Sequence, residues 1–152
     1  LAEAGLSSLR VSLNSARPDV YLRYYRPRNF GFADVRRSIT EASSRGVFVS
    51  LNLLYFPGVT DCEEEIAALT ELVNACGVNF IQLRNLNIDP ELYLNLLDGV
   101  PFGPSPGLAN FRKRLRKACP GLRFGYFNPA VDGPRRSPPP EPASETPGEG
   151  LA

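Results

Sequence analysis

The chain has 152 residues, enough for one domain with a substantial core, and its formal net charge is +1. This balance gives no electrostatic drive toward nucleic acid or an anionic membrane, so we expect neither partner. No apolar stretch approaches the roughly 20 residues of a membrane span, and the N-terminus lacks the basic and apolar regions of a signal peptide. We therefore expect a cytoplasmic protein.

Histidine and methionine are both absent. Without histidine the chain lacks the usual general base and the commonest metal ligand. The cysteines, Cys62, Cys76 and Cys119, match no short metal-binding motif, and we expect free thiols in a reducing compartment. Cys62 falls in the first turn of a predicted helix, which would favour its thiolate. With no methionine at position 1 and a strand starting almost at once, we expect the chain to begin inside a larger domain.

Strand-like and helical segments alternate along the first two thirds of the chain. The strands are predicted over residues 9–14, 47–56 and 78–87. Between them, a short helix opened by Pro18 runs to residue 25, one amphipathic helix covers residues 32–45, and another follows Thr60 and runs to residue 76. Residues 60–63 (TDCE) have the form of a capping box for the last of these helices. The order predicts an α/β domain with parallel strands in a βαβαβ arrangement and right-handed crossovers.

One side of the first two predicted strands is apolar, and polar residues occupy the other side of all three strands. The apolar positions are Leu9, Val11, Leu13, Val47, Val49, Leu51 and Leu53. The polar positions are Arg10, Ser12, Asn14, Ser50, Asn52, Gln82 and Arg84. Buried polar side chains are costly without partners, so this pattern favours a ligand-lined barrel interior over an open sheet covered on both faces. We expect helices on one face only, with Ser12, Asn14, Asn52 and Gln82 on the other.

The candidate binding residues lie at the carboxyl ends of these strands, where barrel enzymes place functional groups. Ser12 and Asn14 end the first strand, and Asn52 occupies the matching place on the second. They could bind a ribose or a carboxylate; the alternative is a polar layer satisfied by itself and water. Arg84 on the third strand has no acidic neighbour on its face, so we expect it to bind a carboxylate or phosphate unless it is solvated.

Two further segments carry clustered cations. Residues 24–28 (YYRPR) follow the first strand and would suit a flat anionic substrate, with an ordinary surface loop as the alternative. Residues 111–117 (FRKRLRK) are predicted to form a solvated, basic helix face. This helix belongs to a C-terminal extension over residues 98–131. Residues 132–152 are rich in proline and almost free of large apolar residues, which predicts a disordered tail.

Residues 1–97 resemble the second half of a radical SAM (S-adenosylmethionine) domain. RVSLNSARPDVYLRYYRP resembles the fourth strand of that family, SLNLLYFPGVTDCEEE the fifth strand and its turn, and VNFIQLRNLNIDPELY the sixth. The first run is similar to the branch that contains molybdenum cofactor biosynthesis protein A. The resemblance implies part of a (β/α)6 partial TIM-like barrel, in which a [4Fe-4S] iron–sulfur cluster reductively cleaves S-adenosylmethionine. It also implies that Ser12 and Asn14 help to hold the nucleoside, that Asn52 lies near the adenine and methionine parts, and that Arg84 lies at the pocket wall.

The sequence departs from the family in lacking the Cys-x-x-x-Cys-x-x-Cys motif and the Gly-Gly-Glu type of segment. We therefore expect a C-terminal fragment of a radical SAM enzyme that contributes part of the cofactor and substrate pocket. It would hold no catalytic residue and no metal ligand, and it would be inactive without the missing N-terminal half of the barrel. The alternatives are a non-catalytic remnant that serves as an interaction module, or a fragment of another TIM-barrel enzyme. The last would need a lysine or carboxylate on an inner strand face, and none is visible.

Overall fold

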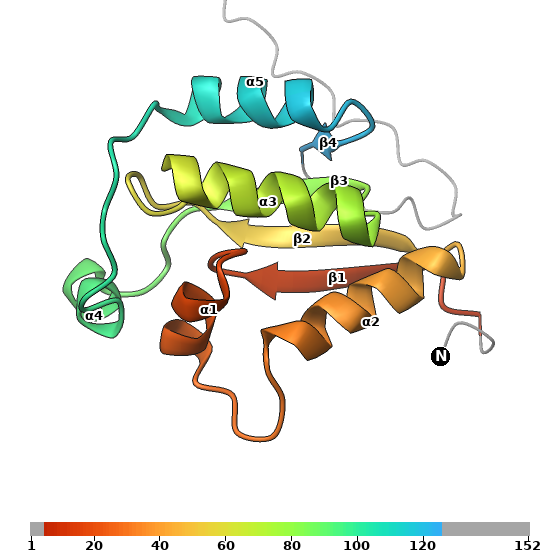
Figure 1. The fold of residues 1–152 in the computed structure, drawn as a ribbon, viewed down its shortest axis with the longest axis horizontal. Helices are drawn as coiled ribbons and strands as arrows, with labels where there is room; N and C mark the ends of the chain where they lie inside the picture. Colours follow the sequence, from red (N-terminus) through yellow and green to blue (C-terminus); the bar gives the residue numbers. More distant parts are fainter. Residues whose placement is uncertain (1–4, 126–152) are drawn as a thin grey trace, which may run out of the picture.

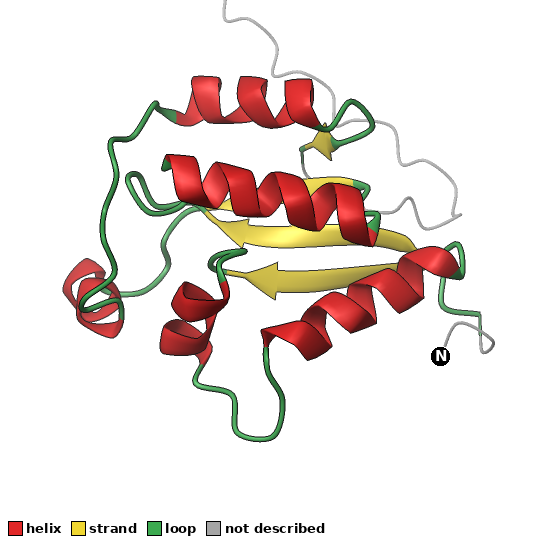
Figure 2. Ribbon diagram, viewed as in Figure 1, coloured by secondary structure: helices red, strands yellow, loops and turns green. Residues whose placement is uncertain are grey.

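Four parallel strands form one sheet in a computed structural model that describes residues 5–125 of the chain (Figures 1 and 2). In spatial order the strands are β1 (Ser8–Leu13), β2 (Phe48–Leu54), β3 (Phe80–Arg84) and β4 (Arg123–Phe124). The helices are α1 (Pro18–Tyr25), α2 (Phe32–Ser44), α3 (Glu63–Cys76), α4 (Pro90–Leu96) and α5 (Leu108–Ala118). The predicted α/β class with parallel strands in chain order is confirmed, with β4 as a short addition at one edge.

Three helices, α2, α3 and α5, lie against the same face of the sheet (Figure 1). The odd-numbered residues of β1, β2 and β3 point into this layer, and Val49, Leu51, Leu53 and Ile81 are fully buried there. Their helical partners at zero exposure are Ile39, Leu69, Leu72, Phe111 and Leu115. Burying side chains of this size contributes about 1.5–3 kcal/mol each. The alternating apolar positions of the strands therefore form the main core together with these helices.

The other two helices, α1 and α4, lie beyond the carboxyl ends of β1 and β2 (Figure 1). They build a second, smaller apolar cluster from Val20, Leu54, Val59, Tyr93, Leu97 and Val100. Each begins with a proline in its first turn, a position where the missing N–H costs nothing. This cluster fixes the loops that leave the strands, and so it shapes the carboxyl edge of the sheet.

The predicted capping box at the start of α3 is wrong. The helix begins after Cys62, which makes no side-chain capping bond. Thr60 does not cap the helix, because its hydroxyl bonds within the preceding turn. That hydroxyl donates to the Leu54 carbonyl and accepts from the Phe56 amide, each at 2.9 Å. The predicted favouring of a thiolate at Cys62 is also wrong, because burial raises the pKa of this thiol.

The described part of the chain contains no helix that is both long and apolar enough to cross a membrane. The tail predicted over residues 132–152, and the end of the predicted extension beyond residue 125, lie outside the described residues.

Candidate functional site

A row of polar residues crosses the face of the sheet that is opposite α2, α3 and α5. Ser12 of β1 is in register with Asn52 of β2, and Asn52 is in register with Gln82 of β3. Neighbouring strands lie about 4.8 Å apart, so the three side chains start close together on one face. Ser12 is exposed, Asn52 is half-buried and Gln82 is buried. The predicted placement of these three residues on the face away from the helices is confirmed.

A pocket of about 200 Å³ lies at the carboxyl end of this row. Ser12, Asn52 and Arg84 line it together with Tyr24 and Tyr25 of α1. The structure thus brings together three of the four predicted site residues, which come from three neighbouring strands. The two tyrosines belong to the segment 24–28, which the sequence analysis proposed as suited to a flat anionic substrate.

The polar groups in this pocket are not all satisfied from within. The Asn52 Oδ1 atom is buried and accepts no hydrogen bond from any of residues 5–125. A buried acceptor without a donor costs about 1–3 kcal/mol, and a ligand hydroxyl or amine would remove that cost. Arg84 forms no ion pair with any residue in the range 5–125, so its guanidinium is available for an anion. These observations fit a polar ligand that carries both hydrogen-bond donors and a carboxylate.

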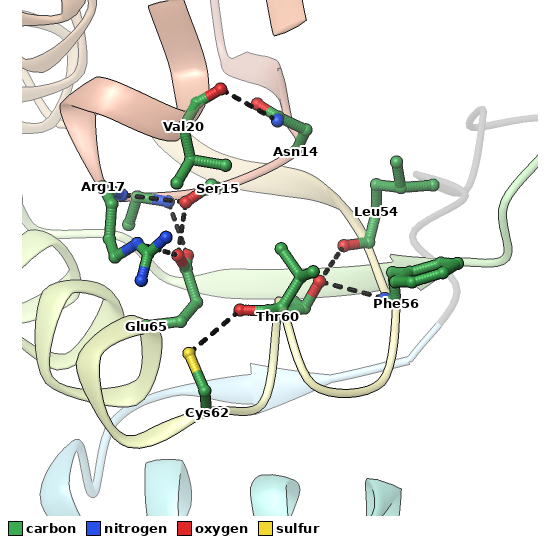
Figure 3. Close-up of polar contacts among 11 residues, drawn as sticks. Asn14, Ser15, Arg17, Val20, Leu54, Phe56, Thr60, Cys62 and Glu65 are labelled. Carbon is green, nitrogen blue, oxygen red and sulfur yellow. Dashed lines mark hydrogen bonds and ion pairs between the residues drawn. The ribbon is translucent and has the colours of Figure 1, made fainter. Parts of the chain in front are cut away.

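Asn14, the fourth predicted site residue, does not line the pocket, and its expected place on the open face beside Ser12 is wrong. Its side chain is fully buried, and its amide donates to the Val20 carbonyl at 3.4 Å (Figure 3). It lies beside Tyr93, whose pKa is raised by burial while the Asn14 amide opposes that increase. The reason is that β1 ends at Leu13, so strand alternation no longer governs the next side chain.

A buried carboxylate that the sequence analysis missed lies at the start of α3. Glu65 has no exposed surface; it accepts hydrogen bonds from the Ser15 hydroxyl and, at 2.6 Å, from the Ala16 amide (Figure 3). Arg17 Nε lies 3.9 Å from Glu65 Oε2. Burial raises the pKa of Glu65 to about 7, although Ser15, Ala16 and the Arg17 charge act in the opposite direction. Glu65 therefore ties the segment after β1 to α3.

The pattern of α3 contained the signal for this carboxylate. Glu65 precedes Leu69, Leu72 and Cys76 by four, seven and eleven residues, which places it on the same face of the helix. An acidic residue on the apolar face of a helix must find donors or become protonated. It was hidden in the run Glu63–Glu64–Glu65, of which the first two members are exposed.

A second buried carboxylate, Asp61, holds the turn after β2. It accepts from the Tyr55 hydroxyl at 2.8 Å, from the Gly58 amide at 2.6 Å and from the Ser105 hydroxyl. Burial would raise the pKa of Asp61, but the donors Ser105, Gly58 and Tyr55 outweigh it and lower this pKa overall. Because Ser105 lies in the loop before α5, Asp61 fastens that loop to the carboxyl edge of the sheet.

The described residues do not fit an iron–sulfur cluster. No group of three or more potential metal ligands occurs among residues 5–125. All three cysteines are buried free thiols, and burial raises the pKa of Cys62 and of Cys119. Cys62 and Cys76 flank α3, and its 14 residues separate them by roughly 20 Å at 1.5 Å per residue. A cluster needs several thiolates that converge on one point.

Comparison with known proteins finds a match to one family model over the first part of the chain. Residues 1–70 match the model described as the Radical SAM superfamily. The match covers β1, β2 and most of α3, which include Ser12 and Asn52. The superfamily resemblance is thereby confirmed, while the likeness to the branch of molybdenum cofactor biosynthesis protein A stays a prediction.

Among the solved structures that are similar is a radical SAM methyltransferase from Sphaerobacter thermophilus. It is 23% identical with a TM-score of 0.49, and the alignment covers 78% of this chain and 33% of the methyltransferase. The aligned part thus spans about a third of that protein. No curated protein matches the chain. The parallel sheet with its main helices on one face is a finding of the structure itself, and its place in a radical SAM barrel stays a prediction.

Proposed function

We propose that this chain supplies part of the S-adenosylmethionine and substrate pocket of a radical SAM enzyme. The observation that carries the proposal is the row Ser12–Asn52–Gln82 beside an unsatisfied Asn52 Oδ1, on the face away from the main helices. Ser12 and Asn52 both fall within the radical SAM match. A row of this kind has no role in the apolar core, so a polar ligand is the natural partner of these side chains.

Each pocket residue has a role that follows from its chemistry. The Ser12 hydroxyl and the Asn52 amide hydrogen-bond the hydroxyl and amino groups of the nucleoside. The Arg84 guanidinium binds a carboxylate of the cofactor or of the substrate. Tyr24 and Tyr25 present aromatic surface to a flat ring. When bound, S-adenosylmethionine together with its cluster supplies the radical chemistry of the family.

The cluster itself is proposed to depend on residues outside this sequence. The described thiols do not converge, and the sequence has no Cys-x-x-x-Cys-x-x-Cys motif. We therefore propose a protein that is inactive without a further barrel half carrying that motif, in the reducing cytoplasm. Neither nucleic acid nor a membrane is part of this proposal. The substrate remains a small molecule of undefined class.

Cofactor binding tests the pocket directly. In a protein extended by the upstream coding sequence and loaded with its cluster, the double substitution Ser12→Ala with Asn52→Ala should weaken S-adenosylmethionine binding. Each lost hydrogen bond to a buried ligand costs on the order of 1 kcal/mol, so the pair should raise the Kd roughly tenfold or more. Equilibrium dialysis measures the Kd, and iron and sulfide analysis checks that the cluster content is unchanged.

Ser50→Ala is the matched control for this double variant. Ser50 lies on the same strand and the same face as Asn52, but its hydroxyl donates to the Leu9 carbonyl and it does not line the pocket. Its Kd should stay within about twofold of the unmodified protein. A double variant that binds as tightly as this control would contradict the assignment of the pocket.

Activity of the chain by itself tests the proposed dependence on a missing half. Anaerobic reconstitution with iron and sulfide should give neither a stoichiometric cluster nor 5′-deoxyadenosine from the 152-residue chain. Both should appear once an upstream segment with the three-cysteine motif is present. Cluster and product formed by the chain alone would refute this dependence. An upstream reading frame without such a motif would instead favour a non-catalytic interaction module.

A further inference from the structure

A basic hollow on α5 lies apart from the pocket described above. It measures about 360 Å³ and is lined by Arg112, Lys113, Arg116 and the small side chain of Ala109. Helix α5 packs on the opposite face of the sheet from Ser12 and Asn52, so this hollow is not an extension of the proposed cofactor pocket (Figure 1).

Two of the three cations are held in place by one aromatic ring. The guanidinium carbons of Arg112 and Arg116 each lie 5.5 Å from the centre of the Phe124 ring in β4. Attraction between a guanidinium and an aromatic face fixes a long side chain that would otherwise be mobile. It also holds two like charges on one helix, four residues apart, where they repel each other. The arrangement brings positive charge together, and no carboxylate of residues 5–125 forms an ion pair with it.

The cations that line the hollow are not neutralised by any carboxylate within residues 5–125. Arg114 on the same helix pairs with Glu63 of α3, whereas Arg112, Lys113 and Arg116 form no ion pair there. In addition, the Arg112 Nε atom is buried and has no hydrogen-bond partner. A buried donor of this kind carries an unrecovered desolvation cost. An anion seated in the hollow would supply the acceptor and neutralise the charge.

We propose that this hollow binds a phosphate monoester dianion. Arginine is suited to such a ligand because its planar guanidinium donates two parallel hydrogen bonds to phosphate oxygens. Three cations that have no ion-pair partner in the described part of the chain surround one hollow, and they favour a doubly charged group over a singly charged phosphodiester. The ligand is therefore a small phosphorylated molecule or a phosphorylated side chain rather than a nucleic-acid backbone. This inference does not depend on the proposed radical SAM function.

The buried Arg112 Nε–H group provides a direct reporter. In ¹H–¹⁵N spectra of the 152-residue chain at constant ionic strength, titration with glycerol 1-phosphate should shift this signal to saturation. Arg116→Ala should weaken the binding roughly tenfold, as expected for the loss of a charge-assisted bidentate contact. Lys117→Ala removes the same charge from the same helix, but Lys117 does not line the hollow, and its effect should stay under about twofold.

Three results would overturn the proposal. One is an Arg112 Nε–H signal that does not respond to the monoester. Another is equal weakening by Arg116→Ala and Lys117→Ala, which would show diffuse charge attraction instead of a site. The third is binding of dimethyl phosphate as tight as that of the monoester, which would assign the hollow to phosphodiesters. Phe124→Leu keeps an apolar side chain but removes the ring. This variant should bind the monoester more weakly, while its circular dichroism spectrum stays unchanged.

Discussion

Substituting Glu65 by glutamine should remove a pH dependence of stability that arises from one buried carboxyl. Glu65 is fully buried, and burial raises its pKa from the ordinary value of 4.5 to about 7. A raised pKa means that the folded state holds the proton more tightly than the unfolded state. The stabilisation is then complete below pH 4.5 and is lost as the pH rises through about 7. Each pKa unit corresponds to about 1.4 kcal/mol, which gives a total change of about 3 kcal/mol.

Urea unfolding followed by far-UV circular dichroism at pH 5, 6, 7 and 8 measures this change. The unmodified chain should lose stability across the range relative to Glu65→Gln, because other titrating groups cancel in the difference between the two proteins. Glu64→Gln is the control: Glu64 is exposed on the same helical turn, and its pKa is lowered, first by a backbone hydrogen bond, so it titrates below this window. Parallel curves for the unmodified chain and Glu65→Gln would refute the reasoning.

Two further outcomes follow from buried polar groups. Tyr55→Phe removes a hydrogen bond to the buried Asp61 carboxylate and should lower the free energy of unfolding by about 1.5–3 kcal/mol, measured by urea titration. Tyr25→Phe is the control. It should change the free energy of unfolding little, because the Tyr25 hydroxyl makes no hydrogen bond within residues 5–125. The thiols of Cys62 and Cys119, whose pKa values are raised by burial, should react slowly with a thiol reagent at pH 7.5 and rapidly in denaturant. Fast labelling of the native chain would contradict their burial.

The fold could be predicted from the sequence because alternation is a local signal with a fixed period. Leu51 and Leu53 point into the core and Asn52 between them points away, as the pleat of any strand requires. Helix spacing was equally readable, and prolines marked the starts of α1 and α4. The predicted strands over residues 47–56 and 78–87 were too long, because apolar residues continue into turns that serve the second cluster.

The site was only partly predictable because its details depend on where strands end. Ser12, Asn52 and Arg84 were found by parity, and the structure places them around one pocket. Asn14 was misplaced by a single residue of strand length, since β1 stops at Leu13. Glu65 was missed because its donors, the Ser15 hydroxyl and the Ala16 amide, come from a loop about 50 residues earlier. The helix spacing marks Glu65 as a residue of the apolar face, but no local pattern identifies donors at that distance.

The two faces of the sheet meet different physical requirements, and this separation supports a binding role for the polar face. On the helical face every strand position gains by being apolar, because the helices remove it from water. Instead, Asn52 follows the fully buried Leu51 and keeps a buried oxygen without a donor. A group that costs stability persists when it contributes elsewhere, and unsatisfied polar atoms in native proteins therefore call for a functional explanation. The pocket at the carboxyl ends of β1, β2 and β3, where Ser12, Asn52 and Arg84 meet, provides the place for that contribution.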